Sequence, residues 1–142
     1  MIILDTNVVS ELMRPVPHPA VATWAKNQRW TTVLTTSITA YEITFGIERL
    51  ATGLKQEKLR QIWHDVRTEF MIGRFLTLDA IAAVHSARLR AKANAQGDNT
   101  KDICDLLIAG IAIREQACIA TRNTKDFAET GVQLINPWEA GN

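Results

Sequence analysis

The chain begins with the stretch Met1-Ile-Ile-Leu-Asp-Thr-Asn7, in which four apolar residues are followed at once by an acid. Short apolar runs of this kind, with β-branched side chains, are typical of a buried strand. Thr6 or Asn7 then offers an N-cap for a brief helix that reaches Met13. We therefore predict a strand over residues 1–5 that leads directly into a helix, with the carboxylate of Asp5 overhanging the end of the strand.

The rest of the chain repeats this alternation of strand and helix. Apolar or β-branched runs predict further strands at residues 31–36, 75–78, 117–121 and 132–135. Ser37 or Thr39 is placed to cap a helix that continues to Gly53, and the other predicted helices span residues 21–28, 54–71, 79–95 and 102–115. This alternation indicates an α/β fold, here a three-layer sandwich with a central, largely parallel sheet of four or five strands. We expect residues 1–142 to form a single domain.

Composition and charge narrow the class of protein. With 46% apolar and 22% charged residues, the chain has the composition of an ordinary globular protein, and its net charge of +1 creates no bulk attraction for nucleic acid. The longest apolar run, Leu106 to Ile113, is too short to span a membrane, and the N-terminus lacks the features of a signal peptide. Cys104 and Cys118 both lie in apolar surroundings, which fits buried thiols in a reducing compartment. We therefore expect a cytoplasmic protein.

Three acidic residues stand inside apolar segments. Asp5 ends the first predicted strand, Glu42 lies within Ile38–Ile47, and Asp105 lies within Ile103–Ile113. An isolated ionised carboxylate is costly to bury, so such acids usually have a partner, a raised pKa or a metal ion. In open parallel sheets, ligands bind beyond the carboxyl ends of the strands, where the helices that follow strands also begin. We expect the three acids to converge at this edge.

A divalent cation would resolve the repulsion between these acids. Two carboxylates about 5 Å apart repel by roughly 3 kcal/mol at an effective dielectric constant of about 20. Lys101 is the only basic residue within four positions of any of the three acids. Carboxylate oxygens, with no nearby histidine or paired cysteine, favour Mg²⁺ or Mn²⁺ over zinc. Asp5, Glu42 and Asp105 are therefore the candidate metal ligands and catalytic residues.

Each acid also has a structural explanation. Asp, Thr and Asn, the residue types at positions 5–7, are all preferred at helix caps and turns. Asp105 lies three residues after Asp102, where its carboxylate is able to complete a capping box. Glu42 is able instead to form an ion pair with a distant arginine.

A further polar group follows the fourth predicted strand, in Thr121-Arg-Asn-Thr-Lys-Asp-Phe127. Asn123 is an uncharged oxygen ligand suited to orienting a water molecule, and we include it among the candidate catalytic residues. Asp126 either joins the site or caps the turn that follows, and Arg122 and Lys125 either bind phosphate or are solvated loop charges.

Five segments occur in a specific order along nearly all of the chain. They are Ile3-Leu-Asp-Thr-Asn-Val-Val-Ser-Glu11, Ser37-Ile-Thr-Ala-Tyr-Glu42 with Gly46 following, Asp105-Leu-Leu-Ile-Ala109, Ala120-Thr-Arg-Asn-Thr-Lys-Asp-Phe127 and Ile135-Asn-Pro-Trp138. In this order and at these spacings the chain resembles PIN-domain ribonucleases of the VapC toxin kind, and is especially similar to the FitB-like subgroup.

This resemblance implies the toxin half of a type II toxin–antitoxin pair, which cleaves RNA with Mg²⁺ or Mn²⁺ held by Asp5, Glu42 and Asp105. It also implies a homodimer and a DNA-binding antitoxin whose C-terminal segment lies across the catalytic cleft. The family often carries a fourth acid at the position that Asn123 occupies here, which leaves open whether a second metal ion binds.

Two other functions remain as alternatives. One is a catalytically inactive PIN-like module that binds RNA or protein, although such a module has no need to retain mutually repelling acids. The other is a small-molecule phosphatase of the haloacid-dehalogenase type, which also begins with an Asp after its first strand. That chemistry needs a second Asp two residues later, where this chain has Asn7.

Overall fold

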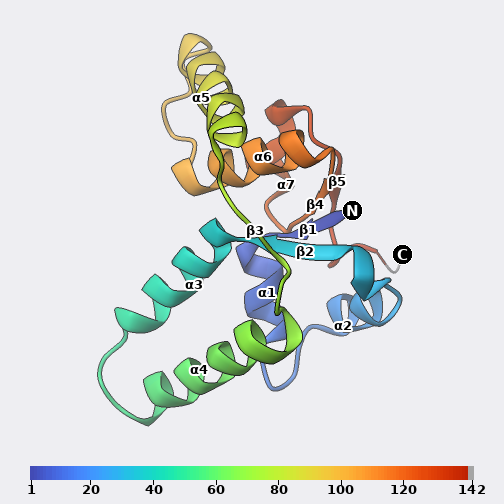
Figure 1. Ribbon diagram of the computed structural model, residues 1–142, viewed down its shortest axis with the longest axis vertical. Helices are drawn as coiled ribbons and strands as arrows, with labels where there is room; N and C mark the ends of the chain where they lie inside the picture. Colours follow the sequence, from blue (N-terminus) through green and yellow to red (C-terminus); the bar gives the residue numbers. More distant parts are fainter. Residues whose placement is uncertain (141–142) are drawn as a thin grey trace.

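The computed structural model describes residues 1–140, and within them five strands form one sheet in the order β3-β2-β1-β4-β5 (Figure 1). The strands are β1 (Ile2–Leu4), β2 (Val33–Thr36), β3 (Phe75–Leu76), β4 (Cys118–Ala120) and β5 (Leu134–Ile135). All neighbouring strands are parallel. The predicted α/β class is confirmed, and every carboxyl end of a strand lies at the same edge of the sheet.

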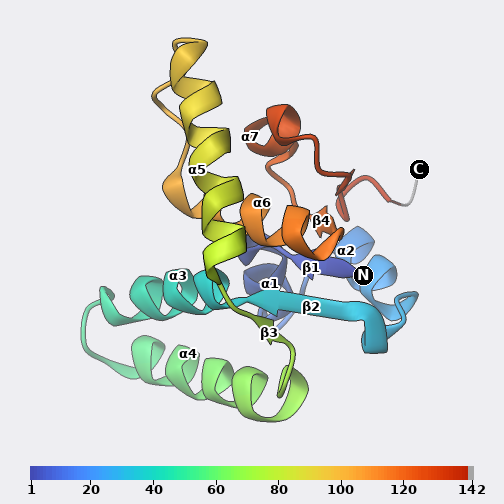
Figure 2. The same ribbon diagram turned by 45° about the horizontal axis from the view of Figure 1, so that its top comes forward.

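Helices cover both faces of the sheet, which confirms the predicted three layers (Figures 1 and 2). One face is covered by α1 (Thr6–Leu12), α2 (Pro19–Lys26), α3 (Ser37–Glu48) and α4 (Leu54–Asp65). The other is covered by α5 (Ala80–Ala95), α6 (Ile103–Glu115) and α7 (Thr124–Phe127). Short 3-10 turns at Trp30–Thr32 and Ala128–Thr130, and a π-helical turn at Val66–Phe70, extend the neighbouring elements.

Two apolar clusters hold these layers together, one on each face of the sheet. Leu4 packs with the cluster beneath α1 to α4, whereas Ile3, its neighbour in β1, packs with the cluster beneath α5 to α7. This division follows from the alternation of side chains along a strand. Trp24 and Trp63 are buried in the first cluster. Trp30 is not, since it is 40% exposed.

The predicted N-caps of two helices are wrong by one or more residues. Asp5, not Thr6 or Asn7, caps α1, because its Oδ1 accepts the Thr6 N–H at 2.7 Å. Thr36, not Ser37 or Thr39, caps α3, because its hydroxyl accepts the Thr39 N–H at 3.1 Å. In both places the chain passes from strand to helix without a loop. The capping residue, which has extended backbone angles, is therefore the last residue of the strand or the residue directly after it.

The end of α3 also differs from the prediction. The helix stops at Glu48 rather than continuing to Gly53, which instead precedes α4. The reason is Gln56, which is buried and whose Nε2 donates to the carbonyl oxygens of Ile47 at 3.1 Å and Leu50 at 3.2 Å. A side chain thus satisfies the carbonyls that a longer helix would satisfy internally. The helices α3 and α4 run antiparallel to each other (Figure 2).

On the opposite face, α5 and α6 approach closely at Gly110. A Cβ atom at this position would clash with the Ser86 hydroxyl and the Ala82 carbonyl, and would lie 2.9 Å from the Ser86 backbone nitrogen. Glycine is therefore required here by the close approach of the two helices. This contact fixes α6, and with it the first turn of α6 at the carboxyl edge of the sheet.

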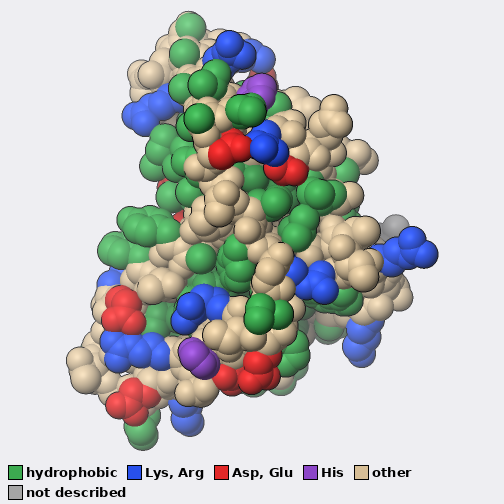
Figure 3. All heavy atoms as spheres, viewed as in Figure 1, with side chains coloured by type: hydrophobic (Ala, Val, Ile, Leu, Met, Phe, Trp, Pro, Cys, Tyr) green, Lys and Arg blue, Asp and Glu red, His purple; other side chains and the backbone are tan. Residues whose placement is uncertain are grey.

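The surface carries charges of both signs. Figure 3 shows basic and acidic side chains interspersed over the face it presents, in keeping with the net charge of +1. Within residues 1–140, no helix has both the length and the apolar character needed to cross a bilayer.

Candidate active site

The topology brings the ends of β1 and β4 together at the centre of the carboxyl edge. The connections from β1 to β2 run over one face of the sheet, whereas α5 and α6, which lead to β4, lie on the other (Figure 1). The strand order therefore reverses between β1 and β4, which is the position where open α/β sheets bind ligands. Asp5 follows β1 and Thr121 follows β4, and the Asp5 N–H donates to the Ala120 carbonyl at 3.0 Å.

Asp5 is the most deeply buried acid of the site, at 2% exposed. Its Oδ1 accepts the Thr6 N–H, and its Oδ2 accepts both the Asn7 side-chain amide and the Thr121 hydroxyl, each at 2.7 Å. Burial raises the pKa of Asp5, while these three donors oppose the rise. The carboxylate is thus held in one orientation by neutral groups rather than by a cation.

Glu42 lies in the second turn of α3 and is half-buried. The Thr6 hydroxyl donates to its Oε1 at 2.6 Å. Thr6, the residue directly after Asp5, thus connects Glu42 to the end of β1. Burial raises the pKa of Glu42, and the negative charges of Asp5 and Asp102 raise it further. None of the ion pairs within residues 1–140 involves Glu42, so the alternative of an arginine partner is wrong.

Asp105 occupies the first turn of α6 and is half-buried. Burial is the main cause that raises its pKa to about 7, and the charges of Asp5, Asp102, Asp126 and Glu42 add to it. Its carboxylate accepts no hydrogen bond in the described part of the chain, so it does not complete a capping box. Asp102 alone caps α6, by accepting the Cys104 N–H at 2.7 Å.

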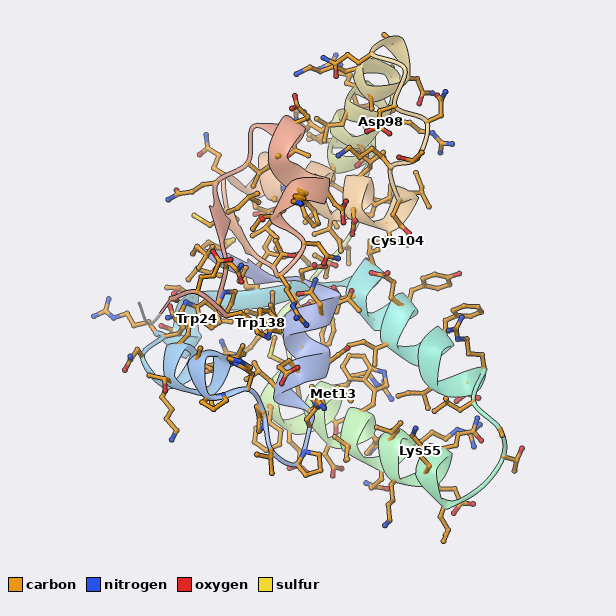
Figure 4. All side chains as sticks on the ribbon, turned by 180° about the vertical axis from the view of Figure 1, so that it is seen from behind. Met13, Trp24, Lys55, Asp98, Cys104 and Trp138 are labelled. Carbon is orange, nitrogen blue, oxygen red and sulfur yellow. The ribbon has the colours of Figure 1, made fainter. Side chains whose placement is uncertain are left out.

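The three predicted acids share one electrostatic field at the carboxyl edge, since the charge of Asp5 raises the pKa of both Glu42 and Asp105, and the charge of Glu42 raises the pKa of Asp105. Figure 4 labels Cys104, which precedes Asp105 and lies at the start of α6, across from the start of α3. The acids are not yet close enough to form a metal site. Across residues 1–140, no three His, Cys, Asp or Glu side chains lie near enough to one another to coordinate one ion.

Within residues 1–140, none of the ion pairs joins a lysine or arginine to Asp5, Glu42 or Asp105. Lys101 instead donates to the carbonyl of Asp126 at 3.1 Å and lies 3.9 Å from the Asp98 carboxylate. Among the described residues, this set of carboxylate oxygens is therefore mutually repelling and has no basic side chain paired with it. Such a set fits a hard divalent cation, because the cation would favour joint ionisation of the acids.

The loop after β4 lies beside the same site. Asn123 is exposed, and its backbone N–H donates to the Thr121 hydroxyl at 2.9 Å. Asp126 raises the pKa of both Asp5 and Asp105 through its charge, which places it near the site as well. The Arg122 backbone N–H donates to Asn7 Oδ1 at 3.1 Å, and its guanidinium lies 5.4 Å above the centre of the Trp138 ring system.

Sequence reasoning missed three contributors to the site. The hydroxyls of Thr121 and Thr6 hold Asp5 and Glu42, and Asp102 adds negative charge beside Glu42 and Asp105. Thr121 had a visible signal, because it is the first polar residue after an apolar strand, as Asp5 is. Asp102 was interpreted only as a helix cap.

A family model described as the PIN domain matches residues 2–133. The chain belongs to the PIN-domain family. The resemblance predicted from the five segments is thereby confirmed, and the parallel sheet with its acidic carboxyl edge is the PIN-domain arrangement of this chain. PIN-domain nucleases generally depend on a divalent metal ion.

Two curated relatives align with almost the whole length of this chain. The VapC ribonuclease Y4jK of Sinorhizobium fredii is 34% identical over 139 residues, which is 98% of this chain and 99% of the relative. The toxin FitB of Neisseria gonorrhoeae is 34% identical over 140 residues, covering 97% of this chain and 99% of FitB. A solved structure of FitAB bound to an IR36 DNA fragment superimposes with a TM-score of 0.87 at 32% identity, covering 98% of this chain and 96% of that one.

Proposed function

We propose that this protein is the single-domain toxin of a type II toxin–antitoxin pair and that it is a ribonuclease, dependent on Mg²⁺ or Mn²⁺, that hydrolyses RNA phosphodiester bonds. Relatives of the same length named as a ribonuclease and as a toxin support this function. The observation that carries it is the field shared by Asp5, Glu42 and Asp105 at the point where the strand order reverses.

In this proposal Asp5, Glu42 and Asp105 hold the metal ion. A bound cation lowers the pKa of a coordinated water and offsets the charge of the phosphate. The chain's own part is to orient its acids: Thr121, Asn7 and the Thr6 amide fix the Asp5 carboxylate, and the Thr6 hydroxyl fixes Glu42. Asp105 lacks such donors within residues 1–140, so its carboxylate is the one most free to move towards an incoming cation.

Two side chains of the loop after β4 complete the proposed site. The exposed amide of Asn123 orients the attacking water by hydrogen bonding, without adding charge. Asp126, in the same field as Asp5 and Asp105, takes the place of the fourth acid that this PIN domain lacks at position 123. Lys125, exposed beside them, is available to bind the phosphate of the substrate.

The proposed partner is a DNA-binding antitoxin, in keeping with the relative FitAB, which was solved bound to DNA. We further propose that the toxin acts as a homodimer in the cytoplasm, where its RNA substrate is found. Because the net charge of the chain is only +1, attraction of RNA must come from local groups at the site rather than from a bulk field.

The direct test is incubation of the purified protein with tRNA, rRNA and mRNA, in Mg²⁺ or Mn²⁺ and in chelator. We expect cleavage that needs the ion and that Asp5→Ala abolishes while circular dichroism shows an unchanged fold. Glu57→Gln is the matched control, since Glu57 is an exposed acid on α4 outside the site, and should cleave normally. Retained cleavage by Asp5→Ala would end the assignment.

The open arrangement of the acids favours one alternative, a PIN-like module that binds RNA or protein without cutting. Calorimetric titration with Mg²⁺ and Mn²⁺ separates the two functions. An enzyme should bind the ion, and Asp105→Asn should weaken that binding. A wild-type protein that shows no heat of binding would favour the inactive module.

A further inference from the structure

A lysine joins the two segments that bring acids to the site from the α5–α7 face of the sheet. Lys101 directly precedes Asp102, the N-cap of α6. Its ammonium donates to the carbonyl oxygens of Asp126 at 3.1 Å and Lys125 at 3.4 Å. The side chain is only 15% exposed, which is low for a lysine. The start of α6, which carries Asp105, is thereby tied to α7, which carries Asp126.

The helix α7 needs such support because it is only four residues long. A helix of this length is not stable by itself. Its N-cap, Asn123, makes no side-chain capping hydrogen bond, and its last residue, Phe127, is fully buried in the core. The last carbonyl groups of a helix lack partners further along it, and in α7 two of them accept from Lys101. The lysine therefore acts as a C-terminal cap from another element.

The ammonium is itself held in place by the loop between α5 and α6. It lies 3.9 Å from the carboxylate of Asp98. The Oδ1 atom of Asp98 accepts the backbone N–H of Thr100 at 3.0 Å and its hydroxyl at 2.8 Å, which closes the loop on itself. Figure 4 labels Asp98 and Cys104 at the two ends of the segment that carries Lys101. The tie from α6 to α7 thus rests on an ordered loop.

We propose that Lys101 is a positioning residue of the metal site, which holds Asp126 beside Asp5 and Asp105 by fixing the turn of α7. This inference rests on the proposed metal-dependent function, and it assigns to that function a residue that acts through Asp126 rather than by contact with the ion or the RNA. The charge of Asp126 raises the pKa of both Asp5 and Asp105, although Asp126 is exposed on a very short helix. Something must keep that helix in place, and Lys101 is bonded to it.

The sign of the effect on metal affinity separates this role from two others. A positive charge near carboxylates opposes the binding of a second cation, so loss of the Lys101 charge alone would strengthen the binding of Mn²⁺. A lysine that serves only the stability of the fold leaves the affinity of the folded molecules unchanged. Loss of the tie to α7 instead releases Asp126 and weakens the binding of Mn²⁺.

The test is calorimetric titration of Mn²⁺ into the full-length protein. Lys101→Met should bind Mn²⁺ roughly tenfold more weakly than the wild type, in the range seen when the supports of metal ligands are removed. Lys101→Arg keeps the charge and the donors and should restore most of the affinity. Lys92→Met is the matched control, since Lys92 is an exposed lysine near the end of α5, and it should bind Mn²⁺ as the wild type does.

Two further measurements show whether the effect passes through Asp126. In an Asp126→Asn background, Lys101→Met should weaken Mn²⁺ binding no further, because coupled residues are not additive. In the metal-free protein, the backbone N–H of Asp126 donates to the Asn123 carbonyl at 3.0 Å. Its hydrogen exchange should be faster in Lys101→Met than in Lys92→Met, because α7 opens more often.

The inference is overturned if Lys101→Met binds Mn²⁺ as tightly as Lys92→Met or more tightly, or if its loss and that of Asp126→Asn multiply in the double variant. Circular dichroism checks the fold, and Lys101→Gln, whose shorter side chain stays polar, carries the same expectations if Lys101→Met does not fold. Wild-type protein that binds no Mn²⁺ overturns the metal-dependent function as well. Unchanged affinity in Lys101→Met, beside a wild type that binds the ion, overturns this inference alone.

Discussion

Thr121 and Asp5 are 116 positions apart in the sequence, yet the Thr121 hydroxyl donates a 2.7 Å hydrogen bond to Asp5 Oδ2. The same hydroxyl accepts the Asn7 side-chain amide at 3.2 Å and the Asn123 backbone N–H at 2.9 Å. A single buried oxygen therefore joins the end of β4 to the end of β1. The orientation of the central acid depends on this neutral group.

The first prediction concerns that hydroxyl. Thr121→Val keeps the volume but leaves the Asp5 carboxylate and two donors without their partner, so we expect a loss of about 1–3 kcal/mol in the free energy of unfolding. RNA cleavage should fall by at least tenfold, since Asp5 loses its fixed orientation. Urea denaturation and cleavage assays measure the two effects. Thr32→Val, which removes an exposed loop hydroxyl bonded to the Arg29 carbonyl, is the control. Equal behaviour of the two variants would show that Thr121 does not position Asp5.

The second prediction concerns pH. The pKa of Asp105 is raised from 3.8 to about 7 in the folded protein, mainly by burial. A carboxyl with a raised folded pKa contributes stability below its unfolded pKa, and this contribution is lost as the pH rises through the folded value. The metal-free protein should thus lose stability between about pH 4 and pH 7. The share of Asp105 should be about 1 kcal/mol, because the carboxyl is partly solvated.

Urea midpoints at pH 5 and pH 8, with and without Mg²⁺, measure this effect. Asp105→Asn should reduce the difference between the two pH values in the absence of metal. Saturating Mg²⁺ should stabilise the wild type more at pH 8 than at pH 5, because the ion binds the ionised acids. If the urea midpoint of the metal-free wild type changed with pH as little as that of Asp105→Asn, the raised pKa of Asp105 would be contradicted.

The third prediction concerns the end of α3. Gln56→Leu removes the amide that satisfies the carbonyls of Ile47, Glu48 and Leu50, so we expect a loss of about 1–3 kcal/mol in the free energy of unfolding. Gln61→Leu, on the exposed side of α4, should change stability by less than about 0.5 kcal/mol. Activity per folded molecule should remain, because neither glutamine reaches the acids. Comparable losses in both variants would argue against the buried amide as the cap.

The fourth prediction concerns the contact between α5 and α6. Gly110→Ala forces a Cβ against Ser86 and the Ala82 carbonyl, and we expect destabilisation of about 1–3 kcal/mol. Gly46→Ala is the matched control, because a Cβ there meets nothing within 4 Å and alanine favours the helix. Thermal unfolding should therefore shift in opposite directions for the two variants. A neutral Gly110→Ala would mean that the helices separate at little cost.

Much of the fold was predictable from hydrophobic patterning. The helices α5 and α6 match the predicted spans within one residue at each end, because strong caps, Asp79 and Asp102, precede them. The end of α3 was not predictable, since it is set by Gln56 from the next helix. The caps of α1 and α3 were misplaced because the polar residues around each strand end offered several candidates, and only the backbone angles distinguish them.

The acids of the candidate site were predictable from the sequence, but the hydrogen bonds that orient them were not. Burial of Asp5 and the shared field of Asp5, Glu42 and Asp105 follow from the rule that ligand sites form at the carboxyl edge of a parallel sheet. The hydroxyl bonds of Thr6 and Thr121 depend on side-chain rotamers and on pairs distant in sequence, which no local pattern specifies. The roles of the acids as metal ligands stay predictions until an ion is titrated.

The position of β1 in the middle of the sheet has a consequence for biosynthesis. Although β1 is made first, one of its two flanking neighbours is β4, at Cys118–Ala120. While the chain grows on the ribosome, that side of β1 has no partner and the Asp5 carboxylate lacks the Thr121 hydroxyl. The centre is therefore assembled only after β4 has been synthesised, so a nascent chain that lacks β4 does not contain the complete candidate site.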